Sequence, residues 1–340
     1  MRGLLFKGNE DVSMVLLNDL KPDRGEVLIK VKATGICGSD VHGYLGITGR
    51  RIPPMIMGHE FSGYISEIGE GVKNFTAGDR VTVQPLIFCG ECEYCGHGLT
   101  NLCENKKFYG AMDVNGSMAE YICVPEKLVY KLPDSISYLH GTMIEPLAVA
   151  YSAVKRAPEI EGKNVLVVGA GTIGLLVLQI VRSKKPGRIF VVDINELRLD
   201  LAKKMGADFV LNPKNTDIKE FINSETMNRG VDIAFEVVGI SATVQQAMSV
   251  LKKNGICVWV GNSEKMINVN MQEVVTKELN ITGTYAYTHQ EFGETINLLA
   301  GHNLDLDSMI SNVVHLDEGP LMFKRLVKES SELIKVILTD

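Results

Sequence analysis

Two rhythms of hydrophobic and polar positions divide the chain. Up to about Leu147, short runs of strand-like character are separated by glycine. These runs are EVLIKVKATG, FSGYISEIGEG, DRVTVQP, MAEYICVP and KLVYKLP. Such spacing predicts a barrel or sandwich whose strands pair across large sequence separations.

The middle of the chain changes to apolar runs that alternate with segments of helical period. The strand candidates are NVLVVG, RIFVVD, DFVL, VDIAFEVVG, ICVWVG and NITGTYA. Between several of them, INELRLDLAKKMGA and ISATVQQAMSVLKKNG show the spacing of a helix. Strands that alternate with helices predict βαβ units and a parallel sheet.

The pattern after about His289 predicts one helix, EFGETINLLAGH, and a final strand, ELIKVILT. We expect this tail to return to the first domain, which makes that domain discontinuous. A chain of 340 residues is also long for a single core. We therefore predict an α/β protein with a doubly wound parallel-sheet (Rossmann) domain at residues 148–288 and a β-rich domain formed by residues 1–147 and 289–340.

Composition narrows the classes of function. The net charge is −6 and the pI is about 5.7, which argues against a general affinity for nucleic acid or anionic membranes. The start, MRGLLFKGNEDVS, lacks the apolar region of a signal peptide. The run from Val165 to Val181 is uncharged, but its three glycines favour a buried strand, turn and helix over a membrane span. We expect a soluble cytoplasmic protein with neither a membrane nor a nucleic acid as its partner.

A glycine motif predicts a dinucleotide site. Gly169, Gly171 and Gly174 read G-A-G-T-I-G directly after an apolar strand and directly before a helix. Glycines in this context allow a tight turn and let the backbone approach a pyrophosphate at the N-terminus of the helix. A glycine turn without a ligand is the alternative. The predicted cofactor-binding residues are Gly169, Gly171, Thr172, Ile173, Gly174, Asp193 and Arg198.

The end of the next strand bears on the choice of cofactor. Asp193 closes RIFVVD, where a carboxylate accepts hydrogen bonds from the ribose hydroxyls of NAD and repels the 2′-phosphate of NADP. Arg198, one helical turn further on, is the nearby candidate for binding a phosphate. We expect NAD, with NADP as the alternative.

Four cysteines lie within the short stretch CGECEYCGHGLTNLC. Cys89, Cys92, Cys95 and Cys103 follow C-x2-C-x2-C-x7-C, which is a complete tetrahedral thiolate set of the kind that holds a structural zinc. Two disulfides are the alternative, but the total of seven cysteines is odd and a reducing compartment disfavours them. The acidic pI makes a nucleic-acid-binding zinc ribbon a poor fit. We expect His97, within this lobe of residues 89–103, to be an exposed loop residue.

A catalytic metal needs ligands from distant segments and one open position. Cys37 lies in GICGSDVHGY, and His59 and Glu60 lie in MGHEFSG. Each has an ordinary alternative, namely a small core cysteine, a hydrogen-bonded histidine or a solvated glutamate. Spacing alone does not pair them.

Five segments together resemble a known family. GICGSDVH, GHEFSG, the four-cysteine lobe, MIEPLAVAYSA and VVGAGTIG, in this order and spacing, resemble the zinc-dependent medium-chain alcohol and polyol dehydrogenases. The resemblance covers essentially the whole chain, since EIGEGVKNFTAGDRV is similar to the GroES-like barrel of that family and VVDINELRLDLAKKMGA to its cofactor domain. It implies a GroES-like catalytic domain, a Rossmann NAD-binding domain and two zinc ions per chain.

The resemblance also implies roles for the residues around the catalytic zinc. Cys37 and His59 match the two constant ligands, and Glu145 in IEPLAVA stands at the position of the third protein ligand. Glu60 would either coordinate the zinc transiently or support its ligands, so the choice between Glu60 and Glu145 in the resting state stays open. Asp40 matches the carboxylate that orients the ligand histidine.

Two further residues match the proton relay of the family. Ser39 and His42 correspond to a hydroxyl and an imidazole that carry a proton from the alcohol to solvent. Zinc lowers the pKa of bound water from about 15.7 to about 7 and acts similarly on a bound alcohol, so that hydride can pass to NAD. For His42 the alternative is a surface residue beside a turn.

The substrate stays open at this stage. The glutamate in IEPLAVA is typical of the sorbitol and threonine branches, and GHEFSGYI with IEPLAVA is also similar to galactitol-phosphate dehydrogenases. A full structural cysteine set departs from animal sorbitol dehydrogenases. We expect a polyol or related diol, with a phosphorylated polyol or a threonine-like compound as alternatives. Arg50 and Arg51 could bind a substrate phosphate or carboxylate, or be solvated loop residues.

An alternative function of a different class is a dinucleotide-binding sensor that has kept the fold but has no catalytic activity. The presence of all the residues matched to the zinc site and the relay disfavours it. The resemblance further implies a homo-oligomer, a dimer or a tetramer, since relatives commonly join through cofactor-domain strands such as ICVWVG.

Overall fold

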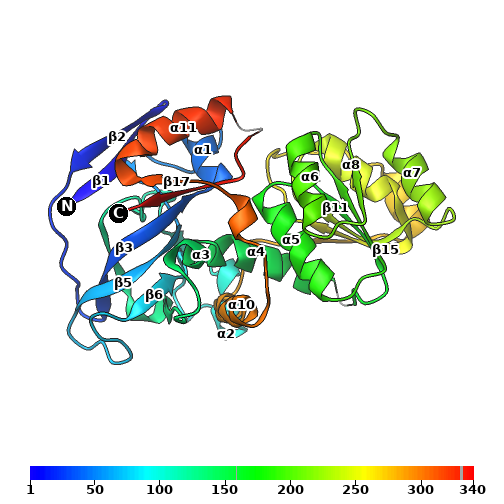
Figure 1. The fold of residues 1–340 in the computed structure, drawn as a ribbon. Coiled ribbons are helices and arrows are strands. Elements are labelled where there is room, and N and C mark those ends of the chain that lie inside the picture. The colour runs from blue at the N-terminus through cyan, green and yellow to red at the C-terminus, as the bar shows by residue number, and fades with distance from the viewer. Residues whose placement is uncertain (158, 330–331) are drawn as a thin grey trace. The chain divides into compact units, whose positions relative to one another are not determined.

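The computed structural model describes residues 1–157, 159–329 and 332–340. The chain forms two compact units, one made of Met1–Glu145 with Thr288–Asp340 and the other of Pro146–Tyr287. The sequence placed the divisions after residues 147 and 288. Figure 1 shows the helices and strands of each unit.

The first unit is built mainly from β-strands. Its largest sheet has the order β10-β6-β5-β3-β18-β17, with β9 also paired to β3, and a second sheet has the order β2-β1-β4. The strands are β1 (Arg2–Gly8), β2 (Asp11–Leu16), β3 (Glu26–Ile36), β4 (Met55–Ile56), β5 (Glu60–Ile68), β6 (Arg80–Val83), β7 (Leu86–Ile87), β8 (Lys107–Phe108), β9 (Tyr121–Pro125), β10 (Val129–Lys131), β17 (Ile310–His315) and β18 (Lys335–Thr339). The predicted strands of the first part of the chain are all found.

The helices of this unit are short or peripheral. They are α1 (Gly38–Tyr44), α2 (Glu93–Gly96), α3 (Tyr138–Thr142), α10 (His289–Gly301) and α11 (Gly319–Lys328), and α4 (Ile144–Lys155) begins at its end. Neither α11 nor β17 was predicted from the sequence. The apolar positions of α11, Met322, Phe323, Leu326 and Val327, recur at helical spacing and pack into the core beside β1 and β18.

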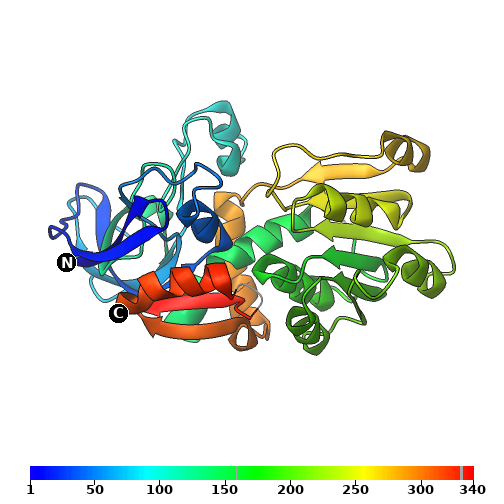
Figure 2. The ribbon, with the colours of Figure 1, turned by 90° about the horizontal axis from the view of Figure 1, so that it is seen from above.

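Strand β3 organises the first unit. Val27, Ile29 and Val31 alternate along it and face one apolar core, while Ile36 at its end joins a second core. The final strand β18 runs antiparallel to β3, with Ile337 opposite Gly35. The tail therefore returns to the first unit as expected, and Figure 2 shows α11 lying along β18 and β17.

The second unit is a parallel sheet with helices on both faces. Its strand order is β13-β12-β11-β14-β15-β16, and every neighbouring pair is parallel. The strands are β11 (Asn164–Val168), β12 (Arg188–Val192), β13 (Phe209–Leu211), β14 (Val231–Glu236), β15 (Leu251–Trp259) and β16 (Asn280–Gly283). The helices are α5 (Thr172–Ser183), α6 (Glu196–Lys204), α7 (Ile218–Glu225), α8 (Ser241–Ser249) and α9 (Met271–Lys277).

This strand order reverses direction next to β11, which defines a doubly wound fold. Right-handed crossovers then place α5 and α6 on one face and α8 on the other, as Figure 1 shows. The predicted parallel Rossmann sheet is confirmed. Two details differ, because the helix predicted over ISATVQQAMSVLKKNG ends at Ser249 and its last residues begin β15. The run ICVWVG begins in β15, which lies between β14 and β16, so the edge strands of this sheet are β13 and β16.

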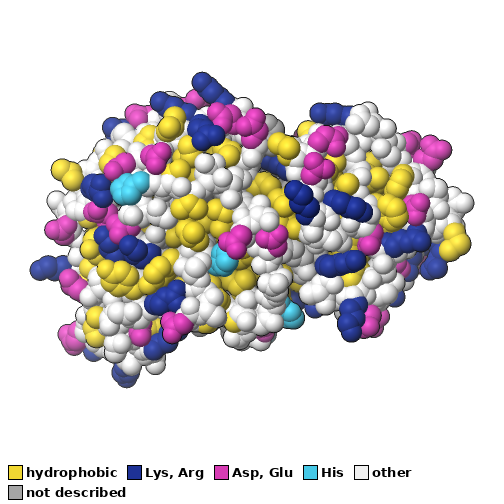
Figure 3. Space-filling view, viewed as in Figure 1, with side chains coloured by type: hydrophobic (Ala, Val, Ile, Leu, Met, Phe, Trp, Pro, Cys, Tyr) yellow, Lys and Arg dark blue, Asp and Glu magenta, His cyan; other side chains and the backbone are white. Residues whose placement is uncertain are grey.

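The apolar run from Val165 to Val181 divides into β11, a glycine turn and α5, as its glycines predicted. Among the described residues, no helix combines the length and apolarity needed to cross a bilayer. On the face shown in Figure 3, basic and acidic side chains are interspersed over both units. That face therefore presents mixed charge rather than a continuous basic surface.

Candidate active site and metal centres

The end of β3 places Cys37 at the start of helix α1. Cys37 has extended backbone and is the N-cap of α1, where its Sγ accepts a hydrogen bond from the Ser39 backbone N–H at 3.5 Å. The Asp40 side chain closes the cap, since its Oδ2 accepts from the Cys37 N–H at 3.1 Å. The GICGSD sequence thus fixes the thiol between a strand and a helix.

His59 comes from a different segment, directly before β5. It follows Gly58, whose φ of +97° lies in the region that glycine tolerates. The imidazole is buried, and its Nδ1 lies 3.5 Å from Asp40 Oδ1. Because Nδ1 faces this carboxylate, Nε2 is the nitrogen left for a metal ion.

Burial alone would lower the pKa of His59, but the Asp40 carboxylate and the Cys37 thiol together raise it well above its ordinary value. The negative charge of Asp40 and Cys37 favours a cation at the imidazole, either a proton or a metal ion.

Cys37, His59 and Glu60 form one group whose ligand atoms all lie within 4.8 Å of one another. A thiolate, an imidazole and a carboxylate are the ligand types that zinc takes. The residues present therefore fit the zinc ion expected here. The structure brings together three of the four sequence-predicted ligands.

The carboxylate of Glu60 also has a buried cationic partner. Lys335 Nζ, from the final strand β18, lies 2.9 Å from Glu60 Oε1 and 2.7 Å from Oε2. The two residues are 2% and 1% exposed. Burial lowers the pKa of Lys335, but Glu60 and then Cys37 outweigh it and raise the pKa above the usual lysine value. Gly35 makes room for this carboxylate, because a Cβ there would collide with Glu60 Oε2.

Glu145, the fourth predicted ligand, lies outside this close group. It is buried in the first turn of α4 and contributes to raising the pKa of Lys335. Glu145 is thus near the same lysine without sharing the 4.8 Å cluster of Cys37, His59 and Glu60.

Asp40 is fully buried and joins several partners. Besides the Cys37 N–H and His59, its Oδ1 accepts hydrogen bonds from Arg51 Nε at 3.3 Å and from an Arg51 terminal nitrogen at 2.8 Å. Burial would raise the pKa of Asp40, but His59 and then Arg51 lower it well below its usual range. Asp40 is therefore a buried, ionised carboxylate that faces the histidine.

The same observation corrects one expectation for Arg51. This residue is 8% exposed and its guanidinium is bound to Asp40 and to Ser39 Oγ, the latter at 3.1 Å. It is therefore not a solvated loop residue. Arg50, next to it, is exposed.

Ser39 and His42 stand three residues apart on α1, and both are exposed. Residues at this spacing share one face of a helix. The neighbouring Asp40 on the same helix is buried and contacts His59. Polar side chains of α1 therefore lie both beside the candidate metal ligands and at the solvent-exposed surface.

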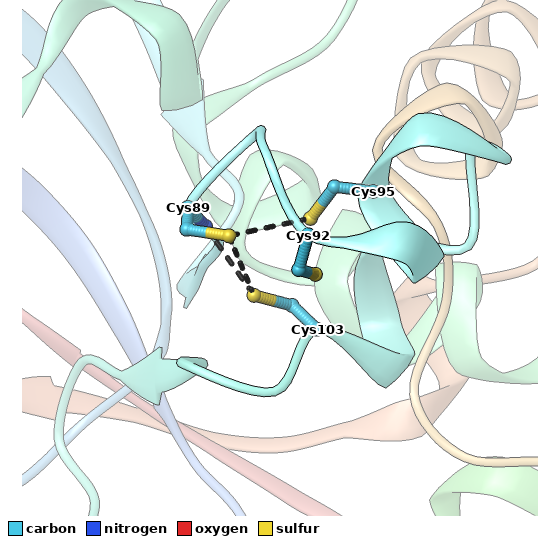
Figure 4. A group of neighbouring side chains, drawn as sticks. All are labelled: Cys89, Cys92, Cys95 and Cys103. Atoms are coloured by element: carbon cyan, nitrogen blue, oxygen red, sulfur yellow. Dashed lines mark hydrogen bonds between the residues drawn. The ribbon is translucent and has the colours of Figure 1, made fainter.

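The four-cysteine lobe brings together a second group of candidate metal ligands (Figure 4). The sulfur atoms of Cys89, Cys92, Cys95 and Cys103 converge from a loop, from α2 and from the turn that follows. Cys89 Sγ lies 3.5 Å from Cys103 Sγ and 3.9 Å from Cys95 Sγ. Bonds of about 2.3 Å in a tetrahedron separate sulfur atoms by about 3.8 Å, so this spacing fits a zinc ion.

The thiols of this lobe differ in pKa because their surroundings differ. Backbone N–H groups of Glu91 and Cys92 lower the pKa of Cys89 to about 6, whereas burial raises that of Cys95 to about 12. All four are free thiols rather than disulfides. His97 is exposed, and its Nδ1 lies 2.9 Å from the Glu93 carbonyl, as expected of a loop residue.

The glycine motif folds into an open cradle at the start of α5. Gly169 has φ +102°, and a Cβ on Gly174 would collide with the Gly169 carbonyl, so both positions require glycine. A Cβ on Gly171 would instead meet nothing within 4 Å. This open side lies at the N-cap of α5, where backbone N–H groups attract a pyrophosphate.

Asp193 lies beside this cradle, at the end of β12. Its Oδ2 accepts from the Ala170 N–H at 2.7 Å, and its Oδ1 from the Asn195 N–H at 2.9 Å. Each oxygen keeps a lone pair for a ribose hydroxyl. Arg198 is half-buried on α6, where its backbone N–H donates to Asn195.

Comparison with known proteins assigns a family to each part of the chain. Residues 23–134 match the alcohol dehydrogenase GroES-like domain, and residues 172–301 match the zinc-binding dehydrogenase family. Sorbitol dehydrogenase of Bacillus subtilis is 33% identical over 342 residues, which cover 99% of this chain and 97% of that protein.

Two solved structures extend the similarity to the fold. 2R,3R-butanediol dehydrogenase from Bacillus subtilis has a TM-score of 0.90 and 32% identity, covering 100% of this chain and 99% of its own. Galactitol-1-phosphate dehydrogenase from Escherichia coli has a TM-score of 0.93 and 28% identity, and each chain is covered fully.

Proposed function

The chain belongs to the zinc-binding alcohol dehydrogenase family, and we propose that it transfers a hydride between the secondary alcohol of a polyol and NAD. The observation that carries this proposal is the convergence of Cys37, His59 and Glu60 within 4.8 Å, beside a hydroxyl on α1. That arrangement joins a metal-ligand set to a candidate path for a proton.

The residues that would hold the catalytic zinc are Cys37 and His59, with the carboxylates of Glu60 and Glu145 nearby. When bound, the ion would act as a Lewis acid that lowers the pKa of an alcohol hydroxyl. Glu60 is paired with Lys335 while it lies in the close group with Cys37 and His59. Glu60 and Glu145 are the two carboxylates that would complete the ligand set.

The proton leaves through residues of α1. Ser39 Oγ accepts the proton of the alcohol as its own hydroxyl proton moves on, and His42 takes up a proton and releases one to solvent. Both residues are exposed and on one helix face, which suits transfer out of a largely buried ligand cluster.

The cradle at Gly169, Gly171 and Gly174 would hold the pyrophosphate of the cofactor, which supplies the hydride acceptor. Asp193 favours NAD because a fixed carboxylate accepts from ribose hydroxyls and repels a 2′-phosphate. Thr172 and Ile173 begin α5 beside the cradle, and Arg198 on α6 would contact the adenosine end.

We further propose a structural zinc at Cys89, Cys92, Cys95 and Cys103, which makes two ions per chain. Four thiolates kept reduced suit the cytoplasm. The protein would act as a dimer or tetramer, with β16 as the edge strand beside β15 that a second copy could extend.

The similarity to galactitol-1-phosphate dehydrogenase supports a phosphorylated polyol as a second candidate substrate. An unphosphorylated polyol is preferred, because Arg51 is already bound to Asp40 and Ser39. A threonine-like substrate and a non-catalytic sensor are weaker candidates.

The test is NADH formation by zinc-loaded protein with panels of polyols, polyol phosphates, diols, threonine and simple alcohols. Turnover of a polyol with NAD supports the proposal. Silence on every panel, with only one zinc ion per chain, contradicts it and favours the sensor.

A further inference from the structure

One guanidinium touches both the candidate proton relay and the carboxylate that orients the metal ligands. The same terminal nitrogen of Arg51 lies 3.1 Å from Ser39 Oγ and 2.8 Å from Asp40 Oδ1. We propose that Arg51 is a positioning residue for the reaction, which fixes the Ser39 hydroxyl and the Asp40 carboxylate in one rigid arrangement. This inference rests on the proposed dehydrogenase function.

The fold is built to hold Arg51 in this place. The stem of Arg51 crosses α1 at Gly43, where a Cβ would collide with the Arg51 side chain. Its backbone is fixed on both sides, since the Met112 N–H donates to the Arg50 carbonyl at 2.7 Å and the Ile52 N–H to the Met112 carbonyl at 2.9 Å. Gly43 makes room for the side chain of this buried arginine, and a β-bridge to Met112 holds its backbone. The fold therefore fixes the position of Arg51.

The hydrogen bonds define what Arg51 does to Ser39. An arginine has no acceptor, so Ser39 Oγ must accept from it and keeps its own O–H free to donate. One lone pair of Ser39 is thereby occupied, and the other remains to receive the proton of an alcohol. The adjacent positive charge also stabilises any negative charge that develops on Oγ.

The other contact reaches both metal ligands through Asp40. Asp40 Oδ2 accepts from the Cys37 N–H, and its Oδ1 lies 3.5 Å from His59 Nδ1. Because Arg51 holds Oδ1 by two N–H groups, rotation of the carboxylate away from His59 is opposed. Arg51 thus orients the histidine and the serine together.

The test compares Arg51→Gln, Arg51→Lys and the matched control Arg50→Gln, since Arg50 is the exposed neighbour. Each is purified with full zinc content and with cobalt in place of zinc. The readouts are the cobalt absorption spectrum, kcat, KM and the solvent deuterium isotope effect on kcat. Ser39→Ala and the double variant with Arg51→Gln complete a mutant cycle.

We expect Arg51→Gln to lower kcat about 10- to 100-fold with little change in KM, to raise the solvent isotope effect and to shift the cobalt spectrum. Arg51→Lys restores part of kcat, because an ammonium reaches one acceptor but not both. In the Ser39→Ala background the loss from Arg51→Gln becomes smaller. Arg50→Gln behaves as the unsubstituted protein.

An unshifted cobalt spectrum together with an unchanged isotope effect in Arg51→Gln overturns the inference. So does full additivity of Arg51→Gln and Ser39→Ala on kcat. If the unsubstituted protein turns over no alcohol, the proposed function is refuted. The cobalt spectrum is measured without substrate, so it still decides whether Arg51 positions the metal ligands.

Discussion

Lys335 Nζ lies 2.7 Å from Glu60 Oε2, and the two residues are 275 positions apart in the chain. The ion pair joins the final strand β18 to β5, the strand that follows His59. It neutralises the carboxylate beside His59 and is almost fully buried. The C-terminal segment therefore contributes a side chain to the group of candidate metal ligands as well as a strand to the sheet.

Replacing Lys335 with Met tests this pair. The change keeps an unbranched side chain but leaves the Glu60 carboxylate buried and without its cation. Breaking one partner of a buried ion pair costs about 3–5 kcal/mol, so the free energy of unfolding should fall by that amount in a denaturant titration. Lys335→Met with Glu60→Gln should recover most of the loss.

The pH dependence of the same pair has a defined sign. The pKa of Lys335 is raised in the folded chain, so its stabilisation is complete below the ordinary lysine pKa of about 10.4 and is lost as the pH rises through the raised value. The difference in unfolding free energy between the unsubstituted protein and Lys335→Met should thus stay constant from neutral pH to about pH 10. A difference that disappears well below pH 10 would contradict a raised pKa for Lys335 in the folded chain.

The thiols of the four-cysteine lobe should differ in reactivity once zinc is removed. The pKa of Cys89 is lowered to about 6, so this thiol is ionised above that pH, whereas Cys95, with a pKa of about 12, stays protonated. At pH 7.5, iodoacetamide should alkylate Cys89 before Cys95. Peptide mass spectrometry after brief labelling measures the order.

Zinc-loaded protein is the control for this labelling, because metal binding should protect both thiols. Equal rates for Cys89 and Cys95 in the metal-free protein would contradict the assigned environments.

Asp193→Ala should change the choice of cofactor. It removes a charged acceptor for the ribose hydroxyls and the repulsion of a 2′-phosphate, so kcat/KM with NAD should fall about 10- to 100-fold relative to NADP. Steady-state kinetics with both cofactors measure this ratio. Asp200→Ala, an exposed acidic residue on α6, is the matched control. An unchanged ratio in Asp193→Ala would remove Asp193 from the cofactor site.

Local patterns predicted most elements of the fold. The glycines of GAGTIG, the apolar runs of the parallel sheet and the final strand ELIKVILT all appear where their sequences indicate. The helix α11 was missed although Met322, Phe323, Leu326 and Val327 carry its periodicity. The boundary at Ser249 was also missed, because LKKNG has helical composition but continues into β15.

The sequence motifs of the candidate site were predicted, but the residues that reach it from distant parts of the fold were not. Cys37, His59 and Asp40 come from local motifs, and the structure brings them together. Lys335 and Arg51 carry no local signal, since a lysine in a terminal strand and an arginine in a loop are ordinary surface residues. Their roles depend on pairings across 275 and 11 positions, which only the tertiary fold determines.

The most direct test of the central claim is alcohol-dependent NADH formation by Cys37→Ala, with zinc counted per chain and NADH binding followed by fluorescence. Cys123→Ala, which changes a cysteine outside both clusters, is the control. We expect Cys37→Ala to keep one zinc ion and to bind NADH but to lose turnover. Cys123→Ala should keep two zinc ions and full activity. Turnover by Cys37→Ala at the rate of the unsubstituted protein would contradict the assignment of the catalytic metal site.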